Sequence, residues 1–478
     1  MPPDSDFTVI IVGGSIAGLT LSHCLNAAGI RNIVLEKHVE IAAQVGASIG
    51  VLPNGGRILD QLGVFPKIEK LIEPLTSAHI SYPDGYTLTS DYPVTVKERF
   101  GRPMAFLTRQ ELIRVLYDSF EDPSHIHVNQ RVARVQQGKD SVRVTTEDGT
   151  SYEGDLVVGA DGVHSKVRAE MWSFHNSPEL ARVAVREHRA LTVEYSCIFG
   201  VSSATPGLNI GEQAAAFADG FTIMTYLGLG GRVYWFVVEK LDRKYTYPHI
   251  PRFTTQDAIT GCERLGGVWL RNSVHFADVW RNRETFAMTA LEEAVLRPWS
   301  SGRIVCIGDS IHKMTPNLGQ GANLAIEDAA ELANTLHAML TSRTPTHRNP
   351  SSASTDKSTH PRRPSTPQLT SHLQSFEANH LARATHIVRM SALMSRLHAR
   401  QGLFYTFLGR YIAPLFPSLP AELISAVVHG APVLGFLPVP PREATGWVLL
   451  ERGRGVLLGV VAVFGCILSG VAFLRFVR

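Results

Sequence analysis

Residues 9–18, VIIVGGSIAG, constrain the fold of this chain more than any other stretch of the sequence. A short apolar run enters a glycine-rich turn, a helical pattern of small residues continues to Gly29, and a second apolar run covers residues 32–35. Strand, turn, helix and strand in this order form a βαβ unit, which predicts a parallel sheet at the start of the chain. The helix that begins at this turn would offer free backbone N–H groups to a phosphate.

The turn departs at one place from the dinucleotide-binding fingerprint G-x-G-x-x-G. Gly13, Ser15 and Gly18 fill its three positions. Serine is small and can donate a hydrogen bond to phosphate, so we expect the turn to bind a dinucleotide despite the substitution. Glu36 closes the second strand, where a carboxylate can accept hydrogen bonds from both ribose hydroxyls. A purely structural turn beside a solvated glutamate would show the same pattern, so this motif alone leaves both interpretations open.

The charge balance and the cysteines exclude several classes of function. The 46 Lys and Arg against 43 Asp and Glu give a net charge of +3, too small to attract nucleic acid through a general field. The five cysteines form no C-x-x-C pair and no Cys/His cluster, so we expect a reducing compartment and no metal site. The N-terminus lacks the basic and apolar regions of a signal peptide.

The C-terminal end has a different character. Residues 455–474, GVLLGVVAVFGCILSGVAFL, form an uncharged run of 20 residues with arginines on both sides. At the rise of a helix, such a run matches the ~30 Å hydrocarbon core of a bilayer. We therefore expect residues 447–478 to be a transmembrane tail in an intracellular membrane, the endoplasmic reticulum, with the body of the protein in the cytosol. A buried core helix is the alternative.

The hydrophobic pattern divides the rest of the chain into regions. Residues 191–239 alternate apolar and polar positions around a break at Gly230 and Gly231, which predicts an antiparallel sheet. Residues 304–307 then return to a buried strand and residues 322–340 to a helix, so the first domain is discontinuous. The expected organisation is a Rossmann-like α/β domain (1–80, 101–170 and 301–340), an inserted antiparallel-sheet substrate domain (81–100 and 171–300), a disordered Ser/Thr/Pro-rich linker (341–368) and a helical, membrane-associated region (369–446).

Two further segments accompany the turn: residues 154–168, GDLVVGADGVHSKVR, and residues 304–329, IVCIGDSIHKMTPNLGQGANLAIEDA. In order and spacing, the three segments resemble the signatures of FAD-dependent monooxygenases of the single-component aromatic hydroxylase type. The resemblance implies noncovalent FAD, with NADPH and O2 as co-substrates. Besides the turn, it places the cofactor contacts on six residues: Glu36, Gly50, Arg109, Asp309, Gly321 and Ala322.

Elementary chemistry agrees with these cofactor positions. Asp309 follows a buried strand, where a carboxylate is costly unless it is hydrogen-bonded, and a ribityl chain could supply those bonds. Gly321 and Ala322 open a helix, whose N–H groups could stabilise negative charge on the reduced flavin. This chain has Ser310 and Ile311 where the family commonly has small apolar residues after its Gly-Asp pair.

The GGSIAG turn and the apolar C-terminus are similar to those of the fungal flavin epoxidases of meroterpenoid and indole-diterpene pathways. This resemblance implies epoxidation of an alkene in the prenyl chain of a lipophilic intermediate. A hydroxylase acting on a lipophilic aromatic or quinone-type substrate fits the same features, and a non-enzymatic membrane flavoprotein is a third possibility. Tyr226, in the predicted sheet, is the first candidate for a catalytic acid or base, followed by Tyr195 and His312. An ordinary structural role is the alternative for each of them.

Overall fold

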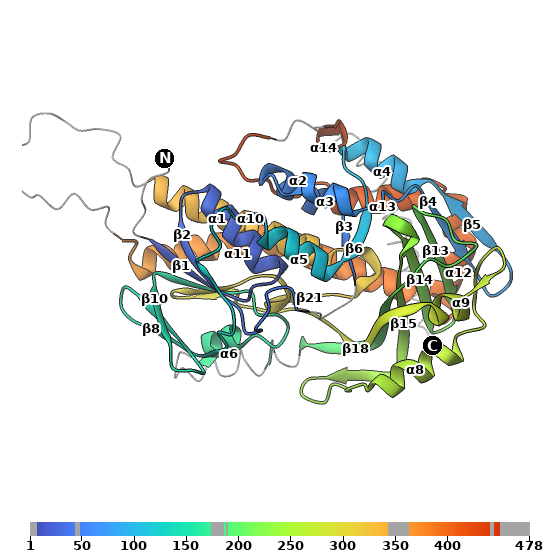
Figure 1. The fold of residues 1–478 in the computed structure, drawn as a ribbon, viewed down its shortest axis with the longest axis horizontal. Helices are drawn as coiled ribbons and strands as arrows, with labels where there is room; N and C mark the ends of the chain where they lie inside the picture. The colour runs from blue at the N-terminus through green and yellow to red at the C-terminus, as the bar shows by residue number, and fades with distance from the viewer. Residues whose placement is uncertain are drawn as a thin grey trace, which may run out of the picture.

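The computed structural model describes residues 7–43, 48–173, 186–187, 190–342, 363–439 and 444–449. A six-stranded sheet of order β19-β20-β11-β1-β2-β7 forms one end of the molecule (Figure 1). All of its pairings are parallel except that of the edge strand β19. Its central strands are apolar and buried on both faces, as covered parallel sheets require. The strands are β1 (Thr8–Val12), β2 (Arg31–Leu35), β7 (Ile126–His127), β11 (Leu156–Gly159), β19 (Ser300–Ser301) and β20 (Ile304–Cys306).

Helices and a small sheet cover the two faces of this sheet. On one side, α1 (Ile16–Ala27) packs against α10 (Gly321–Thr341), and α5 (Arg109–Tyr117) packs beside α1. On the other side lie α6 (Lys166–Ser173) and a three-stranded antiparallel sheet (Figure 1). The strands of that sheet are β8 (Val132–Gln137), β9 (Val142–Thr146) and β10 (Ser151–Gly154). Near α10 lie α2 (Pro53–Gln61), α3 (Phe65–Ile68) and the antiparallel pair β3 (Ser48–Val51) and β6 (Ala105–Thr108).

An eight-stranded sheet of order β21-β18-β12-β15-β14-β13-β4-β5 forms the opposite end of the molecule. The predicted antiparallel region therefore forms strands as expected, although β13 pairs in parallel with β4. One face carries a second apolar core, in which Trp235 packs edge-on against Phe276 and Trp280 of the covering helix α9 (Phe276–Arg281). The strands are β4 (Ser77–Ser81), β5 (Thr87–Ser90), β12 (Thr192–Ser202), β13 (Glu212–Ala218), β14 (Phe221–Leu227), β15 (Val233–Thr246), β18 (Arg283–Val295) and β21 (His312–Lys313).

Shorter elements complete this end of the molecule. They are α4 (Tyr92–Phe100), α8 (Thr255–Arg264), α9 (Phe276–Arg281) and the hairpin of β16 (Trp269–Arg271) and β17 (Val274–His275). Because β4 begins at Ser77 and β21 lies at residues 312–313, the eight-stranded sheet takes in residues that the sequence-based boundaries assign to the α/β domain. Those boundaries follow local pattern, whereas sheet membership depends on pairing between distant segments.

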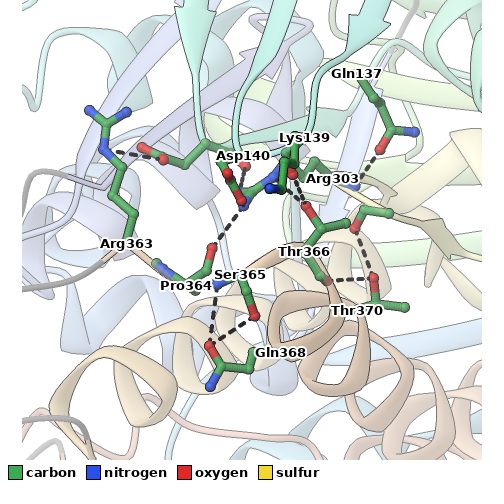
Figure 2. A network of polar contacts seen from close by, with 12 residues as sticks. Gln137, Lys139, Asp140, Arg303, Arg363, Pro364, Ser365, Thr366, Gln368 and Thr370 are labelled. Carbon is green, nitrogen blue, oxygen red and sulfur yellow. Dashed lines mark hydrogen bonds and ion pairs between the residues drawn. The ribbon is translucent and has the colours of Figure 1, made fainter.

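A network around Arg303 fixes the start of α11 (Thr366–His398) to the six-stranded sheet (Figure 2). The Arg303 guanidinium is fully buried and donates to the carbonyl oxygens of Asp155 (2.8 Å) and Pro364 (2.7 Å) and to Oγ1 of Thr366 (2.9 Å). Burying a guanidinium requires such partners on every side. The expected disordered linker over 341–368 is therefore wrong at both ends, because Thr341 ends α10 and residues 363–368 are held in place, whereas residues 343–362 lie outside the described part.

The chain beyond α11 forms α12 (Gly402–Phe407), a π turn η5 (Leu408–Ile412), a 3₁₀ turn η6 (Ala413–Leu415), α13 (Leu419–Val428) and α14 (Gly446–Leu449). Among the described residues, no single helix has the length and apolarity to cross a bilayer. By length and composition, one pair meets the criterion together, residues 402–415 with 419–428, and it is bent by 101°. The predicted transmembrane run, residues 455–474, lies outside the described residues.

Candidate active site

A cavity of about 1000 Å³ runs along the carboxyl ends of the parallel strands and reaches the inner face of the eight-stranded sheet. Its lining residues include Gln130 and Glu36, Ser15 and Asp309, and Tyr226 of the eight-stranded sheet. Clefts at this edge of an open parallel sheet are the usual ligand sites of α/β folds. Residues from all three segments singled out in the sequence line this cavity.

The glycine-rich turn has the tight geometry that its sequence predicts. Gly13 adopts a φ of +113°, and a Cβ added there would stand 2.3 Å from the carbonyl oxygen of Ala160. A Cβ on Gly18 would stand 1.9 Å from the carbonyl oxygen of Gly13, so α1 approaches β1 closely only because this residue is glycine. Ser15 is the N-cap residue of α1, and its Oγ accepts a hydrogen bond from Nη2 of Arg109 at 2.7 Å. The substitution therefore gives the turn a link to Arg109 that glycine could not make.

Glu36 lies at the end of β2 with its carboxylate held in one orientation. Its Oε2 accepts from the backbone N–H of Gly14 at 2.7 Å, and its Oε1 accepts from the backbone N–H of His38 at 2.9 Å. Nδ1 of His38 also lies 2.6 Å from Oε1, whereas Oε2 keeps a second acceptor position. The side chain lines the cavity, so this position on Oε2 suits a ribose hydroxyl.

Asp309 lies in the short turn η3 (Gly308–Ser310), immediately after the buried strand β20. Its carboxylate forms an ion pair with Lys313 and is 38% exposed, toward the cavity that both residues line. Burial acts against the charge of Lys313, but the carboxylates of Asp309 and Glu292 outweigh burial and raise the pKa of Lys313. For Arg109, burial dominates and lowers the pKa from its usual value, although Asp309 and Glu36 oppose this effect.

A buried network supports the Asp309 turn from behind. The carboxylate of Asp328, on α10, accepts from the backbone N–H of Gly308 at 2.7 Å, lies 2.7 Å from Nε2 of His312 and lies 3.0 Å from Nε2 of His380 on α11. Ser310, where the family commonly has a small apolar residue, donates its hydroxyl to the carbonyl oxygen of Gly159 at 2.7 Å. The polar substitution is thus satisfied within the fold and does not intrude on the cavity.

The N-terminus of α10 faces the same cavity. Gly321 and Ala322 line it, and the N-cap residue Gln320 makes no side-chain capping hydrogen bond. In a helix of 21 residues, the first N–H groups carry the positive end of the dipole. This arrangement favours a group that becomes negatively charged, as the sequence-based assignment requires.

The sheet-side end of the cavity is apolar and aromatic. The ring of Tyr226 stacks on Phe106 with centroids 3.8 Å apart and meets Phe236 edge-on at 6.2 Å. Its hydroxyl contacts Sδ of Met224 at 3.6 Å, and burial raises its pKa well above the usual range. The cavity wall at this end also includes Phe199, Leu291, Met314 and Pro316.

The structure separates the three candidates for an acid or base. Tyr226 lines the cavity, whereas Tyr195 and His312 are not among its lining residues. Tyr195 donates its hydroxyl to Oε1 of Gln401 at 2.6 Å, and His312 is buried against Asp328. The two therefore have structural partners, and only Tyr226 remains in a position to meet a substrate.

Sequence reasoning missed several polar residues of the cavity wall, and three of them bear on its chemistry: Ser48, Glu292 and Lys313. The Ser48 hydroxyl is buried and has no hydrogen-bond partner among the described residues. Lys313 pairs with Asp309, and Glu292 lies 3.7 Å from the exposed imidazole of His164. Burial raises the pKa of Glu292. The one sequence signal was the i,i+4 spacing of Asp309 and Lys313; Ser48 and Glu292 reach the cavity only through tertiary placement.

Comparison with known proteins decides what this cavity belongs to. A family model described as an FAD binding domain matches residues 6–185 and 268–351. The FAD-dependent monooxygenase atmM of Aspergillus flavus is 48% identical over 467 residues, which cover 96% of this chain and 94% of that protein. The FAD-dependent monooxygenase nodM of Hypoxylon pulicicidum is 46% identical over 475 residues, 98% of each chain. This chain is an FAD-dependent monooxygenase.

The fold of the monooxygenase is shared with a distant solved structure. The crystal structure of HpxO from Klebsiella pneumoniae, complexed with FAD and uric acid, matches with a TM-score of 0.65 at 20% identity, over 88% of this chain and 97% of that chain. At this identity the likeness shows the fold alone. The resemblance drawn from the three sequence segments is therefore confirmed at the level of family and fold.

The cavity of the monooxygenase fits FAD on its own chemistry. A Cβ on Gly14 would stand 2.6 Å from the side chain of Ile41 and 2.9 Å from that of Glu36, so the turn needs glycine here, directly before the N-terminus of α1, whose N–H groups suit a pyrophosphate. Glu36 and Asp309, which both line the cavity, supply acceptors for ribose and ribityl hydroxyls. Arg109 supplies a cation beside the phosphate-binding turn, through Ser15.

Proposed function

We propose that the enzyme uses NADPH and O2 to epoxidise an alkene in the prenyl chain of a lipophilic, meroterpenoid-type intermediate. In balance, the alkene, O2, NADPH and a proton give the epoxide, water and NADP⁺. When bound, FAD is reduced by NADPH and activates O2, so that one oxygen atom is transferred to an electron-rich substrate. Binding the substrate, orienting it and excluding water are the tasks of the residues of the chain.

The observation that carries this proposal is the apolar, aromatic end of the cavity. Phe106, Tyr226 and Phe236 surround the space next to the expected flavin position, and their stacking fixes them in place. Such a wall binds a hydrocarbon chain by burial and excludes water from it. An alkene held ~3–3.5 Å from the reacting oxygen needs no protein base, because its π electrons form the new bond.

NADPH, the membrane and the location of the enzyme are further parts of this proposal. The sequence holds no second G-x-G-x-x-G segment, which supports a brief visit of NADPH to the surface and not a resident site. The uncharged run at residues 455–474 supports attachment to an intracellular membrane, the endoplasmic reticulum, with the cavity-bearing body in the cytosol. A lipophilic substrate gives such an attachment a purpose.

One observation favours a second candidate, a hydroxylase acting on a lipophilic aromatic or quinone-type substrate. The cavity wall holds a phenol, Tyr226, and a buried carboxyl, Glu292, whose pKa values burial raises. Such groups could hold or move the proton of a phenolic substrate. The named monooxygenases that match over nearly the whole chain argue against a non-enzymatic flavoprotein.

Product analysis tests the proposal. Membranes containing the enzyme are incubated with NADPH, ¹⁸O-labelled O2 and prenylated aromatic candidates, and the products are fragmented by mass spectrometry. One labelled oxygen on the terpenoid chain supports epoxidation. A label on the aromatic ring favours the hydroxylase, and transfer to no lipophilic candidate contradicts both.

A further inference from the structure

An apolar ridge lies on the segment that follows α11. Leu403, Phe407, Tyr411, Leu415 and Phe416 are 90%, 57%, 54%, 69% and 46% exposed. The first four recur every four residues through α12, η5 and η6, so they share one side of this continuous helical segment. The other side is buried: Leu408 is 3% exposed, and the carbonyl oxygen of Gly409 accepts a hydrogen bond from Tyr82 at 3.1 Å. A surface helix normally shows polar residues where this one shows Leu, Phe and Tyr.

From these contacts we propose that the apolar ridge docks into the surface of a lipid bilayer. Between Gly402 and Ala421 the only charged side chain is Arg410, so the segment carries no carboxylate of its own that an anionic lipid surface would repel. The carboxylate of Asp84, from the preceding domain, lies against the segment and is paired with Arg410 at 2.8 Å. Leucine with phenylalanine and tyrosine is the composition of the interfacial zone, where apolar rings enter and the phenol stays near water. Arg410 holds the ring of Tyr411 at 5.0 Å and that of Tyr86 at 3.7 Å.

The continuation of the chain supports a bilayer over a protein partner as the occupant. α14, where the described chain ends, packs on α4, and α13 packs on the same helix directly after the apolar ridge. The sequence then continues to the uncharged run at residues 455–474. A transmembrane helix anchors a chain by itself, and an interfacial contact on the same chain adds a second point of attachment. The apolar ridge would be the second contact and would orient the body of the enzyme.

The position of the apolar ridge gives the docking a consequence for the substrate. His398, four residues before Gly402, stacks on Phe217 of β13 at 4.1 Å. Its Nδ1 lies 3.2 Å from Nδ2 of Asn317, the neighbour of the cavity-lining Pro316. Docking would therefore bring the apolar end of the cavity toward the bilayer. This last step rests on the proposed lipophilic substrate, whereas the docking itself does not.

Lipid quenching tests the docking on the full chain. In a Cys466→Ser background the four remaining cysteines are buried, so a fluorophore can be placed at Phe407→Cys or Leu415→Cys alone. The matched control is Val39→Cys, an apolar site 72% exposed on the α/β domain. The proteins are reconstituted into vesicles with quenchers on the lipid acyl chains. We expect strong quenching at both ridge sites and little at position 39. Quenching at the ridge sites no greater than at position 39 overturns the proposal. A ridge covered by the C-terminal tail or by a second copy of the chain would give that result.

A second variant separates docking from chemistry. The full chain carrying Leu403→Gln, Phe407→Gln and Leu415→Gln should keep its FAD absorbance and its rate in detergent. In vesicles, its KM for a bilayer-dissolved substrate should rise about tenfold, because the cavity is no longer held at the membrane. An unchanged KM in vesicles contradicts the role in substrate supply. Since quenching requires no substrate, docking can be established even where the proposed epoxidation fails.

Discussion

Asp309 illustrates how single residues prepare this cavity for its cofactor. Its carboxylate is shared between an ion pair with Lys313 and the open cavity, and 38% of the side chain remains exposed. The backbone of its turn is fixed by Asp328 through Gly308. A polyol that reaches this carboxylate finds an acceptor that is already oriented, so little ordering has to accompany binding.

We predict that Asp309→Ala lowers the affinity for FAD about ten- to hundredfold, because hydrogen bonds to a charged acceptor are lost. Titration of the apoprotein with FAD, followed by flavin fluorescence, measures the change. Asp118→Ala, at the exposed C-terminal end of α5, is the matched control and should leave the affinity unchanged. Equal affinities of the Asp309 variant and the native protein would show that another group holds the ribityl chain.

Tyr226 offers a residue-level test of the chemistry. In Tyr226→Phe, the stacking on Phe106 survives and only the contact of the hydroxyl with Met224 is lost. If an alkene is the substrate, we expect product formation to stay within about threefold, because no base is needed. Tyr226→Ala should lower the product formed per NADPH consumed, since the wall opens to water. A hundredfold loss in the Phe variant at full FAD occupancy would assign the phenol an acid or base role.

At the scale of elements, α10, α11 and η3 meet at one buried carboxylate. Burial raises the pKa of Asp328, but His312 and His380 outweigh burial, and the net pKa is lowered. For His380, burial lowers the pKa and Arg383 lowers it further. The carboxylates of Asp328 and Glu327 outweigh these two effects, so the pKa of His380 is raised. The stabilisation from His380 is therefore complete below the ordinary histidine pKa of ~6.5 and is lost as pH rises through the raised value.

This network predicts a specific pH dependence. The free energy of unfolding should fall as pH rises above ~6.5 and through the raised pKa of His380, and His380→Gln should flatten that decline. Denaturant unfolding at a series of pH values measures both slopes. His249→Gln, at an exposed turn, serves as the control and should keep the native slope. A His380 variant whose slope matches the native protein would contradict the assignment of the charge to this imidazole.

The elements also show what the sequence could and could not predict. β1, α1, β2 and α10 follow strong local periods and lie where the sequence places them. At their ends, the cofactor candidates Gly13, Ser15, Glu36, Gly321 and Ala322 line the cavity because their motifs are local, whereas Gly18 packs against Gly13 and does not line it. β18 was not predicted, because its residues RETFAMTALEEAV bury Glu292 and Glu293 against partners from distant segments. Local pattern cannot anticipate a buried carboxylate whose counter-charge, such as Arg396, comes from another helix.

Across the whole molecule, one helix connects the two ends. α11 begins at the Arg303 network on the six-stranded sheet and ends where His398 stacks on Phe217 of the eight-stranded sheet. The cavity lies between those two sheets, so α11 fixes the cofactor half relative to the substrate half. The apolar ridge follows directly, which couples any membrane contact to the same rigid element.

The boundary of the C-terminal tail differs from the sequence-based value. Trp447, the first residue of the predicted tail, packs edge-on against Phe100 with ring centroids 4.8 Å apart, and the guanidinium of Arg57 lies 4.1 Å from its ring. Its indole N–H donates to the carbonyl oxygen of Phe100 at 3.2 Å. Trp447 thus belongs to the folded body, and any membrane-crossing segment must begin after it.

Deletion of residues 450–478 should therefore leave FAD content and thermal stability unchanged while weakening membrane attachment. Vesicle flotation without detergent measures the attached fraction, and we expect a partial loss, because the apolar ridge remains. Adding the three glutamine substitutions at Leu403, Phe407 and Leu415 should release the rest. A deletion that also removes Trp447 is the structural control and should lower the melting temperature, since Phe100 becomes exposed. If the full-length chain itself stays unattached, or if the deletion with the ridge substitutions still floats completely, then neither the tail nor the ridge holds this enzyme to the bilayer.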